Sequence, residues 1–178
     1  ELNTPQVNQC SKTWRNIDFN KHVTSITMRK QSKAFSGETN GKLRYKVEDN
    51  YDRLECRDNY KNYINECKQG NKKIKGKRIS ILDFVRDGLK MTYPFNNSNN
   101  DAEREILDLQ WKENSKQTNK LGNMIAMVDT SGSMESDNCI PLYSAIGLGI
   151  RIAENSKLGK RVICLLYTSD AADEITGV

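Results

Sequence analysis

An apolar run leads directly into an Asp-x-Ser-x-Ser sequence at residues 124–134, which read MIAMVDTSGSM. A continuous apolar run of this kind is typical of a strand that is covered on both faces, as in a parallel sheet. Asp129, Ser131 and Ser133 follow at alternate positions, and Gly132 lets the chain tighten between the two serines. The segment therefore predicts a buried strand that ends in a sharp polar turn.

The same three polar residues are candidate ligands for a divalent cation. One carboxylate and two hydroxyls on a turn can converge as oxygen ligands. Mg²⁺ prefers six oxygens, keeps several waters and is usually held by one or two carboxylates together with groups from a partner. We therefore expect Mg²⁺, or a similar cation such as Mn²⁺, at Asp129, Ser131 and Ser133. The alternative is an ordinary turn, because Asp, Ser and Gly are frequent turn residues.

The residues around this turn predict a strand, a helix and a second strand. We expect the strands at 123–128 and from 160 to 163, and the helix at 140–154. The expected apolar face of this helix consists of Leu142, Ile146, Ile150 and Ala153. Gly147 and Gly149 would permit the helix to lie close to the sheet. This order corresponds to the first βαβ unit of a parallel sheet, whose strand edges need further partners.

The first 120 residues read mainly as helices. A helix is predicted over 50–69, ending at Gly70, because apolar residues recur there at helical spacing: Tyr60, Tyr63, Ile64 and Cys67. Ser80 followed by Asp83 is typical of a helix start, and Pro94 would end that helix. A third helix is expected over 101–116, with Ile106, Leu107, Leu109 and Trp111 as candidate buried positions, and a weaker pattern covers 23–35. These patterns give a helical region at 1–95, then a polar connector and linking helix at 96–120.

Basic residues gather in this helical part. Residues 1–120 carry 24 Lys and Arg against 16 Asp and Glu, whereas residues 121–163 carry four of each. The densest run, at 68–78, contains no acid, and its basic members are Lys68, Lys72, Lys73, Lys75, Lys77 and Arg78. Such a run can neutralise phosphates of RNA, with Tyr60, Tyr63 and Tyr93 as stacking surfaces. The alternatives are a solvated loop for the run, and core positions for Tyr60 and Tyr63, which their spacing favours.

The sequence lacks the residues that several classes of function require. The single histidine, His22, is far in sequence from Ser131 and Ser133, and no Walker-type loop occurs, so a hydrolase is not indicated. The cysteines show no C-x-x-C spacing, which argues against a zinc cluster. No stretch is long and apolar enough to span a bilayer, and residues 1–9 do not resemble a signal peptide. We therefore expect a non-enzymatic protein of a reducing, cytoplasmic compartment, with no membrane partner.

Asp129, Ser131 and Ser133, with the apolar run before them, resemble the opening of the metal-ion-dependent adhesion site (MIDAS) of von Willebrand factor A domains. The resemblance implies a Rossmann-like, doubly wound α/β fold, in which ligands sit at the carboxyl ends of the strands. It also implies that a threonine and a further aspartate from later loops complete the site, and neither can be assigned here. Residues 121–163 are then the truncated start of an A domain.

The resemblance extends over most of residues 17–163. Five segments carry it, in this order: FNKHVTSITMRKQSKAF, YKNYINECKQGNKKI, ISILDFVRDGLK, a tryptophan helix and KLGNMIAMVDTSGSM. Their order resembles that of a domain-of-unknown-function family that joins a helical region to a C-terminal von Willebrand A domain. That layout is similar to TROVE-module proteins of the Ro ribonucleoprotein type, in which a helical ring binds RNA. The resemblance implies that residues 1–95 are a TROVE-like, N-terminally incomplete region.

The last fifteen residues differ in character from the rest. Residues 164–174 read CLLYTSDAADE, which resembles a reading frame through a sequencing adapter. We therefore predict that residues 164–178 are an adapter artefact. The alternative is a genuine strand followed by an acidic turn, because residues 162–167 form an apolar run.

These patterns predict an α + α/β chain, with a helical N-terminal region followed by the first βαβ of a Rossmann-like A domain. The function we expect is a metal-dependent interaction module on a basic helical scaffold, in which the cation accepts a carboxylate from a protein partner. The alternative is an RNA-binding ribonucleoprotein component of the Ro type, whose helical half carries the function.

Overall fold

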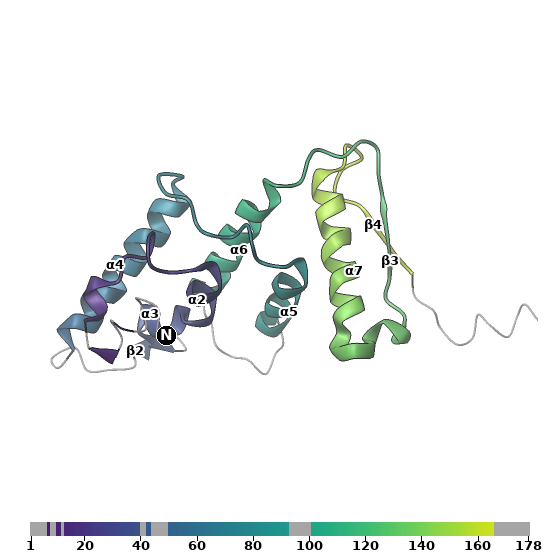
Figure 1. Cartoon of the computed structure of the whole chain (residues 1–178). Coiled ribbons are helices and arrows are strands. Elements are labelled where there is room, and N and C mark those ends of the chain that lie inside the picture. The colour runs from purple at the N-terminus through teal and green to yellow at the C-terminus, as the bar shows by residue number, and fades with distance from the viewer. Residues whose placement is uncertain are drawn as a thin grey trace, which may run out of the picture. The chain divides into compact units, whose positions relative to one another are not determined.

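The computed structural model of the 178-residue chain describes residues 7, 10, 11, 13–39, 42, 43, 50–92 and 101–165. The chain is mostly helical, with a small two-stranded parallel sheet toward its C-terminal end (Figure 1). It divides into two compact units, which we term the helical unit (Glu1–Ile79 with Lys90–Asn114) and the sheet unit (Ser80–Leu89 with Ser115–Val178). None of the helices in the described ranges is long and apolar enough to cross a membrane.

The longest helix of the helical unit is α4, Tyr51–Lys68, which lies within one residue of both predicted ends. Gly70 follows it with a left-handed φ of 81°, a conformation that glycine adopts without strain. The other elements of the unit are the 3₁₀ turn η1 (Trp14–Asn16), α2 (Ser25–Lys30), α3 (Ser32–Ser36), α6 (Asp101–Ser115), and the antiparallel pair β1 (Glu38–Thr39) and β2 (Lys42–Leu43). The predicted helix over 101–116 is therefore confirmed, whereas the short strand pair was not expected.

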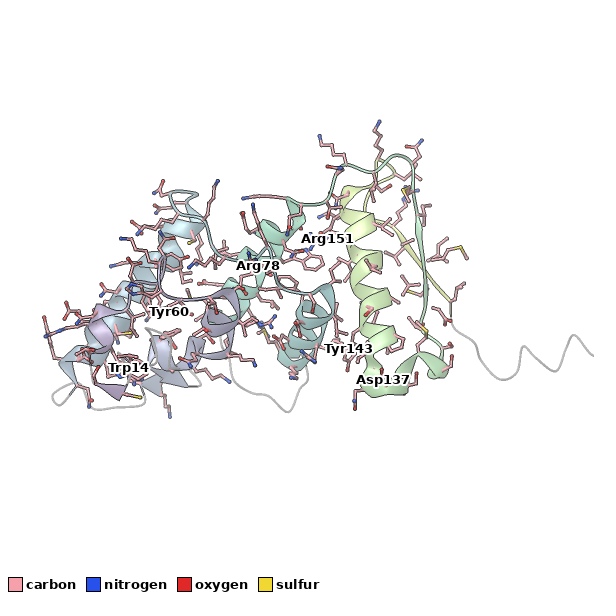
Figure 2. All side chains as sticks on the ribbon, viewed as in Figure 1. Trp14, Tyr60, Arg78, Asp137, Tyr143 and Arg151 are labelled. Carbon is pink, nitrogen blue, oxygen red and sulfur yellow. The ribbon has the colours of Figure 1, made fainter. Side chains whose placement is uncertain are left out.

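Aromatic side chains form the centre of the core in this unit. Tyr60 of α4, which Figure 2 labels, is 1% exposed, and its ring centroid lies 5.2 Å from that of Phe19 and 5.8 Å from that of Phe35. The four periodic residues of α4 are all buried, as predicted: Tyr60, Tyr63, Ile64 and Cys67. Ile106 of α6 is fully buried in the same cluster, and Leu109 packs against it.

The pattern over 23–35 predicts one helix, and the structure contradicts this prediction. The segment forms two helices, α2 and α3, which Gln31 separates with φ −112° and ψ 13°. The Ser32 hydroxyl lies 3.1 Å from both the carbonyl oxygen of Arg29 and Oε1 of Glu103. Such local bonds from a serine side chain compete with the helical hydrogen-bond ladder, which explains the break.

The sheet unit contains a strand, a helix and a second strand in the predicted order. β3 (Ala126–Asp129) and β4 (Val162–Leu165) are parallel, with Ala126 opposite Val162 and Asp129 opposite Leu165. They start three and two residues later than predicted, and β4 includes Cys164 and Leu165 of the tail. Residues 166–178, the rest of the segment predicted to be an artefact, lie outside the described residues.

Two helices belong wholly or mostly to the sheet unit. In α5, Ile81–Thr92, the N–H of Asp83 donates to the Ser80 hydroxyl at 3.1 Å, so the predicted helix start is confirmed. Pro94, the predicted stop, lies outside the described residues. In α7, Ser136–Asn155, residues Asp137, Asn138 and Cys139 have left-handed backbones, so regular helix begins only near the predicted residue 140 (Figure 2 labels Asp137).

Glycines set how closely α7 packs. A β-carbon on Gly149 would lie 2.5 Å from Cγ2 of Val128 in β3, so the predicted close approach to the sheet is confirmed there. Gly147 instead faces α5, where a β-carbon would lie 2.9 Å from Cγ2 of Val85. Ile150 was expected on the buried face, and this prediction is wrong, because its side chain is 43% exposed. The packed face of the helix runs through Gly149 and Ala153 instead.

Candidate functional site

Asp129 is the last residue of β3, at the carboxyl end of the sheet. The backbone N–H of Ser131 donates to Oδ1 of Asp129 at 2.9 Å and closes a tight turn directly after the strand. Asp favours such turns because its carboxylate accepts from the backbone two residues later. The predicted strand followed by a polar turn is therefore observed, with the carboxylate held beside the serine.

The two serine hydroxyls lie side by side on this turn. The Oγ atoms of Ser131 and Ser133 are 3.0 Å apart, and the N–H of Met134 donates to the carbonyl oxygen of Ser131 to form the 3₁₀ turn η3 (Gly132–Glu135). Adjacent oxygen ligands in an octahedral Mg²⁺ shell of ~2.1 Å radius are separated by about 3.0 Å. The spacing of the hydroxyls thus fits a shared cation, although the occupation of the site by a metal stays a prediction.

The electrostatic state of Asp129 suits a cation ligand. The backbone N–H of Ser131, and then the hydroxyl of the same residue, hold the pKa of the Asp129 carboxyl below its usual range. Hydrogen bonds donated to a carboxylate favour its charged form. The turn therefore presents an ionised carboxylate at neutral pH without help from a neighbouring base.

Thr130, the residue between the candidate ligands, has a different role. Its backbone N–H and its hydroxyl both donate to the carbonyl oxygen of Leu165, at 3.1 and 3.0 Å. These bonds tie the turn to the end of β4, so the Thr130 hydroxyl serves the backbone of the neighbouring strand. The position of the turn thus depends on the two strands being paired.

Other side chains that could hold a metal are dispersed. In the described part of the chain, no three His, Cys, Asp or Glu side chains come together at a position that could bind a metal ion. The five cysteines are free thiols, and burial raises the pKa of the Cys56 thiol to about 12. That thiol is therefore neutral and unreactive at physiological pH.

The six predicted RNA-binding residues fall into two groups. Lys68 and Lys72 form ion pairs with Glu105 at 2.6 Å and with Glu66 at 2.5 Å. The other four border one pocket of the helical unit: Lys73, Lys75, Lys77 and Arg78. Figure 2 labels Arg78 among them. All six basic residues are exposed, and all but Lys68 lie in the loop between α4 and α5, so the structure is compatible with the solvated-loop alternative and RNA binding stays a prediction.

Two of the three tyrosines predicted as stacking surfaces, Tyr60 and Tyr63, are buried in the core of the helical unit. Tyr60 and Tyr63 are 1% and 4% exposed, so the alternative prediction that they belong to the core is confirmed. Tyr93 lies outside the described residues.

Sequence reasoning missed the polar residues of α6 that support the basic run. Gln110 is fully buried and Glu113 is 7% exposed, although both are polar. The sequence does contain a signal for their burial. Gln110 and Glu113 follow the buried Ile106 at four and seven positions, so they share its face of the helix. A polar side chain at a core-facing position of a helix needs hydrogen-bond partners there, so such a residue indicates a polar contact inside the fold.

No protein-family model, no curated protein and no solved structure matches the chain.

Proposed function

We propose that the chain is a non-enzymatic interaction module that binds Mg²⁺ or a similar cation through Asp129, Ser131 and Ser133. The observation that carries this proposal is the 3.0 Å separation of the two hydroxyls beside a carboxylate of lowered pKa. When bound, the cation would supply open coordination positions that a carboxylate of a protein partner can fill. The residues of this chain orient the oxygen ligands and keep Asp129 ionised.

We further propose that the sheet unit is the first βαβ of a Rossmann-like von Willebrand A domain. Support comes from the parallel pairing of β3 and β4 and from the position of the site after β3, since ligands of such sheets sit at the carboxyl ends of strands. Met127 and Ile163 also lie opposite each other and are 66% and 47% exposed. Parallel sheets are normally covered on both faces, so this exposure favours a larger domain.

Mn²⁺ is the sharpest probe of the metal site, because its unpaired electrons broaden the NMR signals of nearby nuclei. In the full chain, Mn²⁺ should selectively broaden the amide signals of Ser131 and Ser133, and Mg²⁺ should compete. Binding should be weak, at about millimolar concentrations, because the turn provides a single carboxylate. Asp129→Asn should abolish the effect.

Asp137→Asn provides the matched control for this experiment. It removes the same charge from the same unit, and Asn tolerates the left-handed backbone of this position as Asp does. Equal broadening in both variants and in the wild type would contradict the metal site. For the partner, a short peptide with one Glu should bind only with Mg²⁺, and its Gln counterpart should not bind.

RNA binding by the helical unit is the second candidate function. The observation that favours it is the gathering of four basic residues of one run around a single pocket. Changing Lys72, Lys73 and Lys77 together to Gln should lower RNA affinity equally for all sequences and flatten its salt dependence. Lys75 is left unchanged, because its Nζ donates to the carbonyl oxygens of Lys21 and Val23 and holds the loop. An unchanged salt slope would exclude this function.

A further inference from the structure

The loop that follows α4, residues 69–79, carries most of the basic run, and we term it the basic loop. It is held in place by α6. The buried side chain of Gln110 donates from Nε2 to the carbonyl oxygens of Ser25 and Lys75, both at 3.1 Å. Nδ2 of Asn114 lies within hydrogen-bonding distance of three further carbonyl oxygens of the loop, those of Gly76, Lys77 and Ile79, at 3.3, 3.1 and 3.1 Å. These contacts from the side-chain amides of α6 hold the backbone of the loop against the helix.

A pocket of about 430 Å³ opens beside this loop. Its lining consists of Asn20, Thr24, Ser25, residues 73–78 of the loop, and Glu113. This volume lies within the range of small-molecule sites, and it suits one ligand of about nucleotide size. Because all of these residues belong to the helical unit, the pocket does not depend on the position of the sheet unit.

The charges of the pocket differ from those elsewhere in the basic run. Lys68 and Lys72, which lie outside the lining, are paired with glutamates. Within the lining, Lys75 binds backbone carbonyls, and neither Lys73 nor Arg78 has a carboxylate within 4 Å among the described residues. Of the four cations that border the pocket, Lys73 and Arg78 are therefore available to a ligand.

We propose that this pocket binds a small phosphate monoester of about nucleotide size, held by Lys73 and Arg78. A doubly charged phosphate accepts several hydrogen bonds, and the planar guanidinium of Arg78 can donate two in parallel. None of the described lining residues is aromatic, so the pocket offers no ring on which a base could stack. The pocket would therefore recognise the phosphate and the hydroxyl-bearing group to which it is attached.

A free phosphate monoester fits these observations better than an RNA chain does. A backbone phosphodiester carries one charge, whereas a terminal monoester carries nearly two at neutral pH and gains more from two cations. The volume of the pocket, about 430 Å³, is also close to what one nucleotide needs. This inference goes beyond the metal site and does not rest on it.

Calorimetric titration of the full chain tests this proposal, with adenosine monophosphate, adenosine and inorganic phosphate as probes. The buffer contains a chelator, so the metal site cannot contribute. Adenosine monophosphate should bind with one-to-one stoichiometry, inorganic phosphate more weakly, and adenosine not at all. Lys73→Gln combined with Arg78→Gln should weaken the binding of the monophosphate at least about tenfold, because charged hydrogen bonds are lost.

The chain offers a matched control for this double variant. Lys68→Gln combined with Lys72→Gln removes the same two charges from the same run but outside the pocket, and it should change the affinity less than about twofold. Circular dichroism confirms that both variants are folded. Asp129→Asn should leave the affinity for the monophosphate unchanged, which separates this proposal from the metal site.

Three results would overturn the proposal. Equal weakening by both double variants would show diffuse attraction to the run and no pocket. Tighter binding of an RNA oligonucleotide with hydroxyls at both ends than of adenosine monophosphate would assign the run to a polymer. The absence of saturable binding of both adenosine monophosphate and inorganic phosphate would show that the pocket does not recognise this group.

Discussion

Gly76 of the basic loop touches the backbone of Gln110 in α6, because a β-carbon on Gly76 would lie 2.5 Å from the carbonyl oxygen of Gln110. It would also lie 2.9 Å from the α-carbon of that residue. The atoms in the way belong to a helix backbone and cannot move aside as the end of a side chain can. The absence of a side chain at position 76 therefore allows the loop to reach the amides of α6.

Gly76→Ala should consequently destabilise the helical unit. We expect the free energy of unfolding to fall by about 2 kcal/mol, in the range found for overpacked sites. Gly122→Ala is the control, because a β-carbon there would meet no atom within 4 Å. Chemical denaturation of both variants checks the prediction, and equal stability of the two would refute the close contact.

Asn114→Asp tests whether the side-chain amide holds the loop. The substitution keeps the shape but replaces a donor by an oxygen that faces the carbonyl oxygens of Gly76, Lys77 and Ile79. The variant should lose about 2 kcal/mol of stability at neutral pH, because hydrogen bonds become repulsive contacts. Part of this loss should be recovered at about pH 4, where the new carboxyl takes up a proton. A stability loss that does not vary with pH would contradict this explanation.

Local features of the fold could be predicted from the sequence, whereas distant partnerships could not. The bounds of α4 and the start of α5 follow from spacing and capping within a few residues. The turn after β3 is equally local, since Asp129, Ser131 and Ser133 span five positions. The bond from Gln110 to Ser25 joins residues 85 positions apart, and no periodicity indicates it.

The same distinction explains the features that sequence reasoning missed. The break at Gln31 accompanies a bond from Ser32 to Glu103, which is 71 positions away. The pocket combines residues near 20–25, 73–78 and 113, so only its basic part was visible as a run. Gly147 faces α5 and not the sheet because the tertiary arrangement of α5 decides that contact.

Tyr60 provides a test of the aromatic core. Its hydroxyl is buried and has no hydrogen-bond partner among the described residues, while its ring packs edge-on against Phe19. Tyr60→Phe should therefore leave the stability unchanged or raise it by about 1 kcal/mol, because an unsatisfied polar group is removed. Tyr60→Ala should lower it by about 3–5 kcal/mol, since it leaves a cavity. Thermal unfolding compares the two, and a large loss in Tyr60→Phe would reveal a partner for the hydroxyl.

Asp129 leads to a prediction about pH. Because its pKa is lowered in the folded chain, the carboxylate contributes stability above its unfolded pKa of about 3.9, and this contribution is lost as the pH falls through the lower folded value. Mn²⁺ binding should therefore be constant between about pH 7 and pH 5 and should decline only in more acidic solution.

Ser131→Ala, which removes one of the two donors, should move the pKa of Asp129 part of the way back toward its usual value. Thr130→Val should not move it, because that hydroxyl donates to Leu165. Carbon-13 NMR titration of the Asp129 carboxyl measures these values, and an unshifted pKa in the wild type would show that the serine does not hold the carboxylate.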